Sequence, residues 1–348
     1  MTFYQELQLN QAGSKKLIHE SKTTKEKIYH IAVFLFKIFI TLAFCMGFVI
    51  LYSMLFGSEN SIVGVVILLC VMVFRNVDLG FKHSQALFIF LLFFVILAIG
   101  PRLANMMNPF GALLINLICI GSLVFFGCYN IMMFNHSTLV LGYLLLFGYD
   151  VSGTVYTNRL IAITISAIIC GLIYYRNHHK KTYEKKLKDL FLDFNLSNTS
   201  TQWQITLIFG VCSILFITQL LGFPRVMWVG IAAMSILSPI KGDMKTRAIH
   251  RIPYNIIGGI LCYIIYTFFP DSIFSNIGIL GGIGVGLSAT YGWQSLFNSF
   301  GAISVAAGIF GLPNAIFFRI LDNVIGILYA ILFAILFNKC FARFSSKA

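Results

Sequence analysis

The stretch WVGIAAMSILSPIKGDMKTRAIHRIPYNIIGGILCYIIY, residues 228–266, decides the fold class. It consists of an apolar segment, a short basic loop and a second apolar segment that opens with Arg251. Charge and apolar surface alternate here on the scale of a bilayer rather than of a soluble core. The stretch therefore predicts two membrane-embedded helices joined by a basic loop at the membrane surface.

The composition of the whole chain agrees with this interpretation. Of its 348 residues, 58% are hydrophobic and only 11% are charged. A soluble domain carries about 25% charged residues, so this chain has too little polar surface to cover a globule in water. In lipid the backbone must satisfy its own hydrogen bonds, and the long unbroken apolar runs favour helices over a barrel. The sequence predicts an all-α polytopic membrane protein.

The net charge of +13 does not indicate a nucleic-acid partner. The Lys and Arg residues lie in loops and tails between apolar spans, where they set topology and contact membrane lipids. The eight Cys residues form no CxxC pair, so no disulfide framework and no metal site is expected. GxSxG, HExxH and Walker A sequences are missing, so we expect neither a catalytic residue nor a cofactor, and not an enzyme.

About twelve transmembrane helices are expected, six in each half of the chain. We expect a cytoplasmic tail (1–27), a first repeat (28–175), a basic amphipathic connector (176–202), a second repeat (203–340) and a cytoplasmic tail (341–348). Nearly all Lys clusters then fall in loops on one side, which places both termini in the cytoplasm. The expected spans are 29–56, 61–74, 85–100, 109–128, 137–149, 158–175, 203–222, 226–240, 252–269, 274–290, 296–311 and 316–338.

Residue matches between the halves indicate an internal repeat. Phe134–Asn135 recurs as Phe297–Asn298, and Phe147–Gly148 recurs as Phe310–Gly311 at the same offset. Because both halves have six spans and begin on the inside, we expect two parallel six-helix repeats. In the connector, apolar side chains at helical spacing over 183–194 predict a basic amphipathic helix on the membrane surface.

Ionisable side chains within a membrane are costly, so each one is a candidate functional residue. Arg159 and Arg319 open the last span of their halves, near its outer end, and Asp322 follows Arg319 by one helical turn. These residues could bind an organic anion, with Asp322 neutralising the site or exchanging a proton. Snorkelling of the arginines to the interface and a structural ion pair are the alternative.

Further candidates are polar residues at span ends or inside spans. Arg251 and Asn255 stand at the inner end of their span, as anion contacts or as an interfacial anchor. Asn116 lines a pore or forms a hydrogen bond between helices. Asn135 and Asn298 lie in matching inner turns that mix aromatic and amide side chains, which suit planar anions or an aromatic belt.

Glycine-rich span 274–290 allows two interpretations. Its sequence GILGGIGVGLSATYG contains five glycines before Ser288 and would weaken a helix by about 1 kcal/mol per glycine. The span is therefore either a tightly packed helix or an unwound binding segment.

The residues around the decisive stretch resemble those of the fusaric acid resistance and aromatic acid exporter-like family. The likeness is strongest over 226–268, in SPIKGDMKTRAIHRIPYNIIGG, where a Pro-terminated span precedes a basic loop, an Arg, a polar residue and two glycines. RLIAITISA (159–167) and RILDNVIGI (319–327) look like the Arg-led later helix of that family. The chain departs from the family by having Tyr254-Asn255 in place of the usual Gly-Thr.

This resemblance implies an exporter of small aromatic or other organic anions, coupled to protons, in the bacterial plasma (inner) membrane. A passive anion channel and a non-transporting membrane partner of envelope enzymes are the alternatives, and formation of a homo-oligomer stays open. Many family members carry a large cytosolic domain where this chain has only 176–202. The alternative fold is the major facilitator type. Its characteristic loop sequence is matched only weakly here, by DLGFK (78–82).

Overall fold

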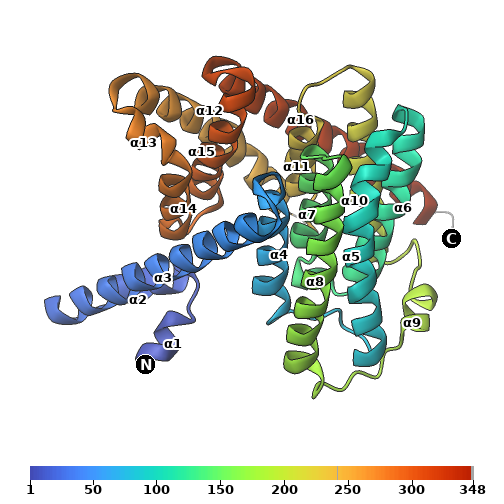
Figure 1. Ribbon diagram of the computed structural model, residues 1–348. Coiled ribbons are helices and arrows are strands. Elements are labelled where there is room, and N and C mark those ends of the chain that lie inside the picture. Colours follow the sequence, from blue (N-terminus) through green and yellow to red (C-terminus); the bar gives the residue numbers. More distant parts are fainter. Residues whose placement is uncertain (241, 346–348) are drawn as a thin grey trace. The chain divides into compact units, whose positions relative to one another are not determined.

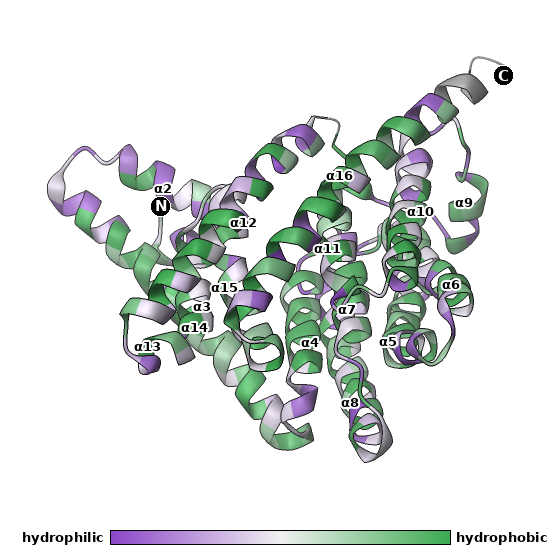
Figure 2. Cartoon of the chain, turned by 90° about the horizontal axis from the view of Figure 1, so that it is seen from above, coloured by the Kyte–Doolittle hydropathy of each residue, from purple (hydrophilic) through white to green (hydrophobic). Residues whose placement is uncertain are grey.

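The computed structural model describes residues 1–240 and 242–345, and in these ranges all regular structure is helical (Figure 1). Lys241 of the predicted basic loop and residues 346–348 of the predicted tail lie outside the described residues. The long helices are mostly hydrophobic, whereas hydrophilic residues gather in segments such as α2 (Figure 2). The helices longer than eighteen residues are α3 (Thr24–Phe56), α5 (His83–Met106), α6 (Pro109–Gly127), α8 (Gly153–His178), α10 (Thr199–Leu220), α12 (Asp243–Phe268), α15 (Tyr291–Phe310) and α16 (Leu312–Ser345).

Shorter helices complete the described chain. Four of them are apolar, namely α4 (Ser61–Phe74), α7 (His136–Gly148), α11 (Val226–Ile236) and α14 (Ile277–Leu287). The remaining short elements are α1 (Phe3–Leu7), α2 (Gln11–His19), η1 (Ser58–Asn60), η2 (Ile131–Met133), α9 (Leu187–Leu192) and α13 (Asp271–Ser275).

Seven helices of the described chain are long and apolar enough to cross a membrane: α3, α5, α6, α8, α10, α12 and α16. The protein is therefore a multi-pass membrane protein. Every expected span coincides with a helix, but α7, with 13 residues, reaches only about 20 Å, less than the roughly 30 Å of a hydrocarbon core. The twelve-span count, the repeat and the side of the termini stay predictions.

Two expected helix boundaries at proline are wrong. The span expected to end at Gly100–Pro101 continues to Met106, and the span expected from 252 begins at Asp243 and contains Pro253. Proline is tolerated inside membrane helices when neighbours satisfy the freed backbone groups. The carbonyl that loses its donor at Pro101 is that of Leu97, four residues earlier. A neighbouring helix contacts the same turn, because the hydroxyl of Tyr156 on α8 donates to the carbonyl of Ala98 at 3.2 Å.

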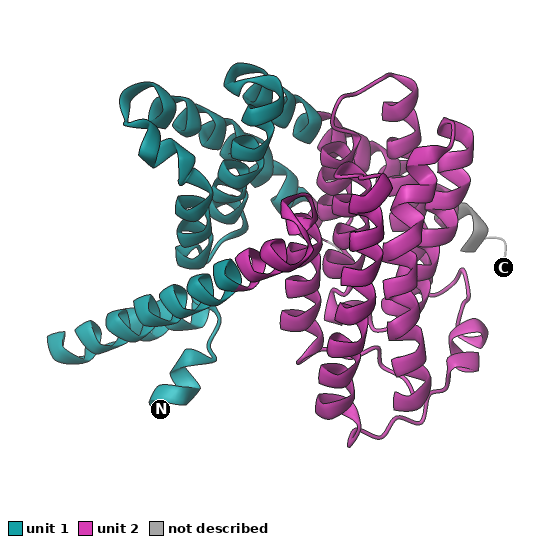
Figure 3. Cartoon of the chain, viewed as in Figure 1, with its two compact units in different colours: residues 1–47, 245–324 teal, residues 48–244, 325–348 magenta. Residues whose placement is uncertain are grey.

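The chain forms two compact units (Figure 3). Unit 1 comprises residues 1–47 and 245–324, and unit 2 comprises residues 48–244 and 325–348. Each unit thus takes segments from both sides of the connector. The two units are defined by which residues pack together, whereas the predicted repeats are defined by sequence similarity between the halves. The units therefore do not test the expected domain boundaries, which stay a prediction.

In unit 2, loops expected on the same side of the membrane lie at the same end of the helices. At one end, Tyr129 donates to Asp193 at 2.7 Å, and the Trp203 ring donates to the carbonyl of Leu237 at 2.9 Å. At the other end, Arg102 pairs with Asp150. Between these ends α5 packs against α6, α7 and α8, and α10 packs against α6 and α11.

The connector differs from its expected form. Its helix is only Leu187–Leu192, whereas 183–194 was expected, and residues 199–202 already belong to α10. Hydrogen bonds join the connector to the start of α5. The backbone N–H of Leu187, the first residue of α9, donates to Oε1 of Gln85, and that of Lys82, directly before α5, donates to the carbonyl of Lys185, both at 2.8 Å. These tertiary bonds compete with the helical bonds that the sequence pattern predicted.

The two terminal tails are more ordered than expected. Residues 1–27 contain α1 and α2, and α3 already begins at Thr24. His30 on α3 contacts Oε1 of Glu6 at 2.8 Å, and Lys37 donates to the carbonyl of Leu9 at 3.0 Å. At the other end α16 continues to Ser345, into the expected tail.

Candidate functional site

Three helices of unit 1 contribute polar side chains to one buried group, which we call the polar cluster. From α12 come Arg251 and Asn255, one turn apart and therefore on one face of the helix. Arg251 is only 8% exposed. Its Nε donates to Oδ1 of Asn323 on α16 at 2.9 Å, and its Nη1 donates to the hydroxyl of Tyr291 on α15 at 2.8 Å. One cation thus connects α12 to both other helices.

The α15 face of the cluster consists of Tyr291, Ser295 and Ser299. Asn255 donates from Nδ2 to the Ser295 hydroxyl at 2.7 Å, and the Ser299 hydroxyl donates to Oδ1 of Asn255 at 2.8 Å. Both ends of the Asn255 amide are therefore bound inside the protein. The three α15 residues recur every four positions, the period of one helical face. That spacing is visible in the sequence, but the residues predicted from the sequence did not include these three.

The α16 part of the cluster consists of Arg319, Asp322 and Asn323. Asn323 donates from Nδ2 to the carbonyl of Arg319 at 2.7 Å, and its Oδ1 accepts from Arg251. The Asn323 amide thus connects the backbone of α16 to the Arg251 side chain on α12. Asp322 has no exposed surface, and neither of its carboxyl oxygens accepts a hydrogen bond from the described part of the chain. Arg319, which is 6% exposed, acts on this carboxyl electrostatically.

Close packing of α12 depends on its two consecutive glycines. A Cβ on Gly258 would lie 2.9 Å from the carbonyl oxygen of Leu296 on α15, and one on Gly259 would lie 2.9 Å from a methyl of Ile316 on α16. The missing side chains let the three helices approach closely. This approach brings Asn255 within hydrogen-bonding distance of the α15 hydroxyls.

The sequence placed Arg251 and Arg319 near opposite ends of their spans, yet hydrogen bonds run from the Arg251 guanidinium through the Asn323 amide to the backbone carbonyl of Arg319. The reason is that α12 begins at Asp243 and α16 at Leu312, earlier than expected. Arg251 then lies about 12 Å and Arg319 about 10 Å along its helix at the α-helical rise. Both arginines are thus interior to their helices.

Arg159, the expected counterpart of Arg319, lies in unit 2 and is 3% exposed. It donates from Nε to Oδ1 of Asn60 at 3.0 Å, and from Nη1 and Nη2 to the carbonyls of Tyr149 and Glu59 at 2.8 and 3.5 Å. Its guanidinium therefore ties α8 to two loops. This use of the donors favours a structural role for Arg159.

The other predicted residues lie apart from the polar cluster. Asn116 accepts from the Tyr143 hydroxyl at 2.8 Å, a bond between α6 and α7. Asn135 donates to the carbonyls of Gly127 and Asp78 at 2.8 and 3.1 Å. Asn298 is exposed and, together with Lys37 and glycines of α14, lines a cavity of about 570 Å³ in unit 1.

The glycine-rich span is helical over Ile277–Leu287. A Cβ on Gly282 would lie 2.8 Å from Leu42, and one on Gly286 would lie 2.8 Å from Ile38, both on α3. The glycines therefore serve close packing between α14 and α3, as in the first of the two interpretations.

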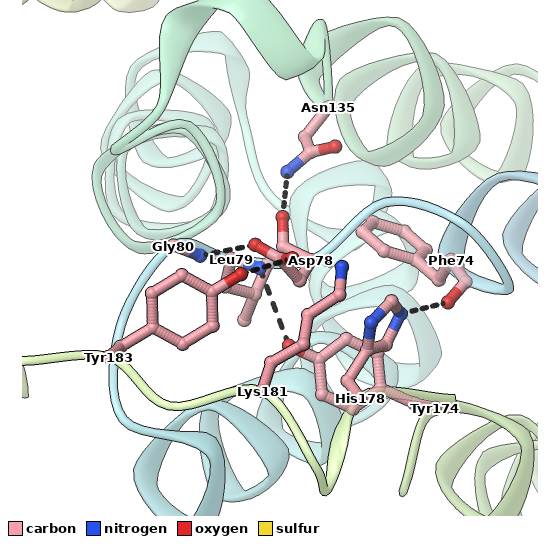
Figure 4. A network of polar contacts seen from close by, with 9 residues as sticks. All are labelled: Phe74, Asp78, Leu79, Gly80, Asn135, Tyr174, His178, Lys181 and Tyr183. Carbon is pink, nitrogen blue, oxygen red and sulfur yellow. Dashed lines mark hydrogen bonds and ion pairs between the residues drawn. The ribbon is translucent and has the colours of Figure 1, made fainter. Parts of the chain in front are cut away.

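A second polar network lies at the connector end of unit 2 (Figure 4). Asp78, between α4 and α5, accepts hydrogen bonds from the Tyr183 hydroxyl, from Nζ of Lys181 at 2.9 Å and from the backbone of Gly80 at 2.9 Å. Its side chain is only 3% exposed, whereas that of Lys181 is 45% exposed. The backbone N–H of Leu79 donates to the Tyr174 hydroxyl at 3.3 Å.

These contacts change the acidity of the residues that make them. Burial alone would raise the pKa of Asp78, but the hydrogen bonds from Tyr183 and Lys181 and the charge of Lys181 hold it below its ordinary value. Burial and the bond to Asp78 raise the pKa of Tyr183. Asp78 is therefore ionised and binds the connector to the loop between α4 and α5.

Asp193 repeats this arrangement at the surface. It accepts from Nζ of Lys185 and from the Tyr129 hydroxyl, both at 2.7 Å, but its side chain is 40% exposed. Hydrogen bonds from Lys185 and Tyr129 lower the pKa of Asp193. Asp78 and Asp193 thus each accept hydrogen bonds from one lysine and one tyrosine, but Asp78 is buried and Asp193 is partly exposed.

Within the described residues, no group of three His, Cys, Asp or Glu side chains could hold a metal ion. The chemistry available to the polar cluster is charge and hydrogen bonding: two buried arginines, one buried carboxyl group and several amides and hydroxyls. Such a set can bind an anion and can take up or release a proton.

No curated protein and no solved structure matches the chain. Residues 211–333 match the family model described as fusaric acid resistance protein-like, a segment that contains every residue of the polar cluster. The resemblance predicted from the sequence is therefore confirmed, and it is the second half of the chain that is similar to the fusaric acid resistance protein-like family.

Proposed function

We propose that the protein is a secondary transporter that exports small organic anions of the aromatic carboxylate type, with a proton bound and released at Asp322. The family match supports a membrane protein of transporter or resistance type. The outward direction, the substrate class and the bacterial inner membrane follow from the resemblance. The observation that carries the proposal is the fully buried Asp322 carboxyl, one turn from Arg319 and without a hydrogen-bond donor in the described chain.

Burying an ionised carboxylate without hydrogen bonds costs several kcal/mol, so the group must bind a proton or be neutralised by a nearby cation. An organic anion that binds beside Arg319 competes with ionised Asp322 for the same positive charge. Anion binding and protonation of Asp322 therefore favour each other, and thermodynamic linkage makes this coupling reciprocal. Anion and proton then cross together, so that export follows the concentration gradient of the anion itself.

Access to the cluster requires a conformational change. Arg251, Arg319 and Asp322 are each at most 8% exposed, so the structure corresponds to a closed state of unit 1. We propose that α12, α15 and α16 separate to admit the anion and close again behind it, as in alternating access. Arg251, bound to both α15 and α16, would then stabilise the closed state.

The test is uptake of labelled benzoate into inverted membrane vesicles that contain the protein, driven by an imposed pH gradient whose alkaline side is the vesicle lumen. We expect Arg319→Gln to lower the rate at least about tenfold, because a charge-assisted hydrogen bond contributes about 1.5–3 kcal/mol. We expect Asp322→Asn, which resembles the protonated form and cannot titrate, to lose uptake driven by the pH gradient but to keep the exchange of labelled for unlabelled benzoate across the membrane. Arg176→Gln, at an exposed arginine in the last turn of α8, is the matched control.

Wild-type vesicles that take up no member of a panel of aromatic acids would overturn the proposal. So would an Arg319→Gln variant that transports as fast as Arg176→Gln. Currents far faster than carrier turnover in planar bilayers would identify the passive channel instead.

A further inference from the structure

A cavity of about 410 Å³ lies in unit 2, at the end where α7 and α10 finish and α11 begins. Pockets of roughly 300–1,000 Å³ are typical of small-molecule sites. The cavity is within unit 2, whereas the polar cluster belongs to unit 1. Its lining includes Asn105, Phe147, Asp150, Gln219, Arg225 and Met227.

Arg225 gives this cavity a buried positive charge. The residue precedes α11 directly and is only 8% exposed. Its guanidinium lies 5.3 Å from the ring of Tyr149 and 5.9 Å from that of Trp228, and Nη1 donates to the carbonyl of Gly148 at 3.4 Å. These three contacts, all with neutral groups, hold the guanidinium at the wall of the cavity.

The carboxylate that lines the cavity is paired with a different arginine. Asp150 accepts a hydrogen bond from Nη1 of Arg102. Arg102, Arg225 and Asp150 together carry one net positive charge. The cavity therefore favours an anionic ligand over a cationic one.

Gln219 offers a second ligand group. The side chain lines the cavity, and its Oε1 is buried without a hydrogen-bond partner in the described part of the chain. Buried polar atoms are nearly always hydrogen-bonded, so the end of this amide lacks a partner in the protein. A carboxylate only accepts hydrogen bonds, so it is the NH2 group of Gln219 that binds it, after the amide turns about its last side-chain bond.

The start of α11 adds partial positive charge beside Arg225. No side chain caps this 11-residue helix, and Val226 and Met227, its first residues, line the cavity. The first N–H groups of a helix lack intrahelical acceptors and attract anions. Phe147 and Met227 provide apolar surface next to these polar groups.

We propose that this cavity is a binding site for a small organic carboxylate. Arg225, Gln219 and the N-terminus of α11 surround the carboxylate, and Phe147 and Met227 contact its apolar part. Gly148 makes room for this arrangement, because a Cβ at that position would overlap the sulfur of Met227. The choice of an aromatic carboxylate as the probe rests on the proposed function, but the site itself is independent of the polar cluster.

The fluorescence of Trp228 provides a local readout, because its ring lies against Arg225 and the chain has only three tryptophans. Trp203→Phe combined with Trp293→Phe leaves Trp228 as the single reporter. We expect a saturable change in its emission when the full-length protein in detergent is titrated with benzoate. Benzamide, a neutral ligand of the same shape, should produce no change at the same concentrations.

In the same background, Arg225→Gln should weaken benzoate binding at least about tenfold, because it removes a charged hydrogen-bond donor. Arg225→Lys keeps the charge and should bind more tightly than Arg225→Gln. The matched control is Arg176→Gln, at an exposed arginine in the last turn of α8, which should bind within about twofold of the unsubstituted protein. If Arg225→Gln does not fold, the benzoate and benzamide titrations and Arg225→Lys still decide the matter.

Equal responses to benzoate and benzamide, or equal binding by Arg225→Gln and Arg176→Gln, would overturn the proposal. Repeating the titration in Arg319→Gln separates it from the proposed function. Benzoate binding that persists there, in a protein that does not transport, supports this site while the transport proposal is judged on its own assay.

Discussion

The connector offers the sharpest stability prediction, which concerns Asp78→Asn. Asp78 is nearly buried and accepts from Tyr183, from Lys181 and from the backbone of Gly80. Removing its charge weakens all three bonds and leaves the Lys181 ammonium without a carboxylate. We expect the segment before α9 to detach from the α4–α5 loop more often in this variant.

The size of the free-energy loss in Asp78→Asn can be estimated from the groups that donate hydrogen bonds to Asp78. A hydrogen bond to a charged group contributes about 1.5–3 kcal/mol, but the half-exposed Lys181 contributes less because water and salt screen it. The amide oxygen that replaces the carboxylate can still accept from Tyr183, so part of the energy remains. We expect a loss of about 2 kcal/mol in the local free energy of opening, which corresponds to roughly a thirtyfold larger open population.

Hydrogen exchange measures this opening directly. The amides of Leu187 and Lys82 both form hydrogen bonds between the connector and α5, at 2.8 Å. Their protection should fall about thirtyfold in Asp78→Asn. Asp193→Asn is the matched control, because Asp193 also accepts from a lysine and a tyrosine but lies at the surface. Equal loss of protection in both variants would refute the reasoning that burial decides the effect.

The same network predicts a pH dependence. The pKa of Asp78 in the folded protein lies below its ordinary value of about 3.9. Its stabilisation of the folded state is therefore complete above about pH 4 and disappears as the pH falls through the lower folded-state pKa. Protection of the Leu187 amide, corrected for intrinsic exchange, should stay constant between about pH 5 and 7. A loss within that window would contradict the assignment to Asp78.

Two further substitutions, measured by thermal unfolding in detergent, test the close helix packing at Gly258 and the hydrogen bonds that Arg159 donates. Gly258→Ala should destabilise unit 1 by about 1–3 kcal/mol, because its Cβ would meet a backbone carbonyl at 2.9 Å, whereas Gly301→Ala, with no neighbour within 4 Å, should be neutral or stabilising. Arg159→Gln should destabilise unit 2 by about 2–5 kcal/mol, because three neutral acceptors lose a buried charged donor, and Arg102→Gln, at a partly exposed pair, should cost far less. Equal unfolding temperatures within either pair would contradict the corresponding interpretation.

The location of helices followed from local sequence information. Each expected span coincides with a helix, because unbroken apolar runs in lipid leave the backbone no other partner than itself. Helix ends were less predictable where they depend on distant groups. Pro101 did not end α5, which packs against α6, α7 and α8 and continues to Met106. The connector helix is short, because Asp78 and α5 bind the preceding segment.

The sequence by itself determined that the chain is a multi-pass helical membrane protein, that its second half resembles one family, and that Arg251, Arg319 and Asp322 are exceptional in an apolar setting. Only the tertiary structure decided which polar groups meet: it joined Arg251 to Tyr291 and Asn323 and turned Arg159 toward loop carbonyls. The physical reason is that the two kinds of information act over different distances along the chain. Apolar length and charge position act along the chain, whereas a hydrogen bond between helices depends on how closely they approach, which glycines such as Gly258 permit.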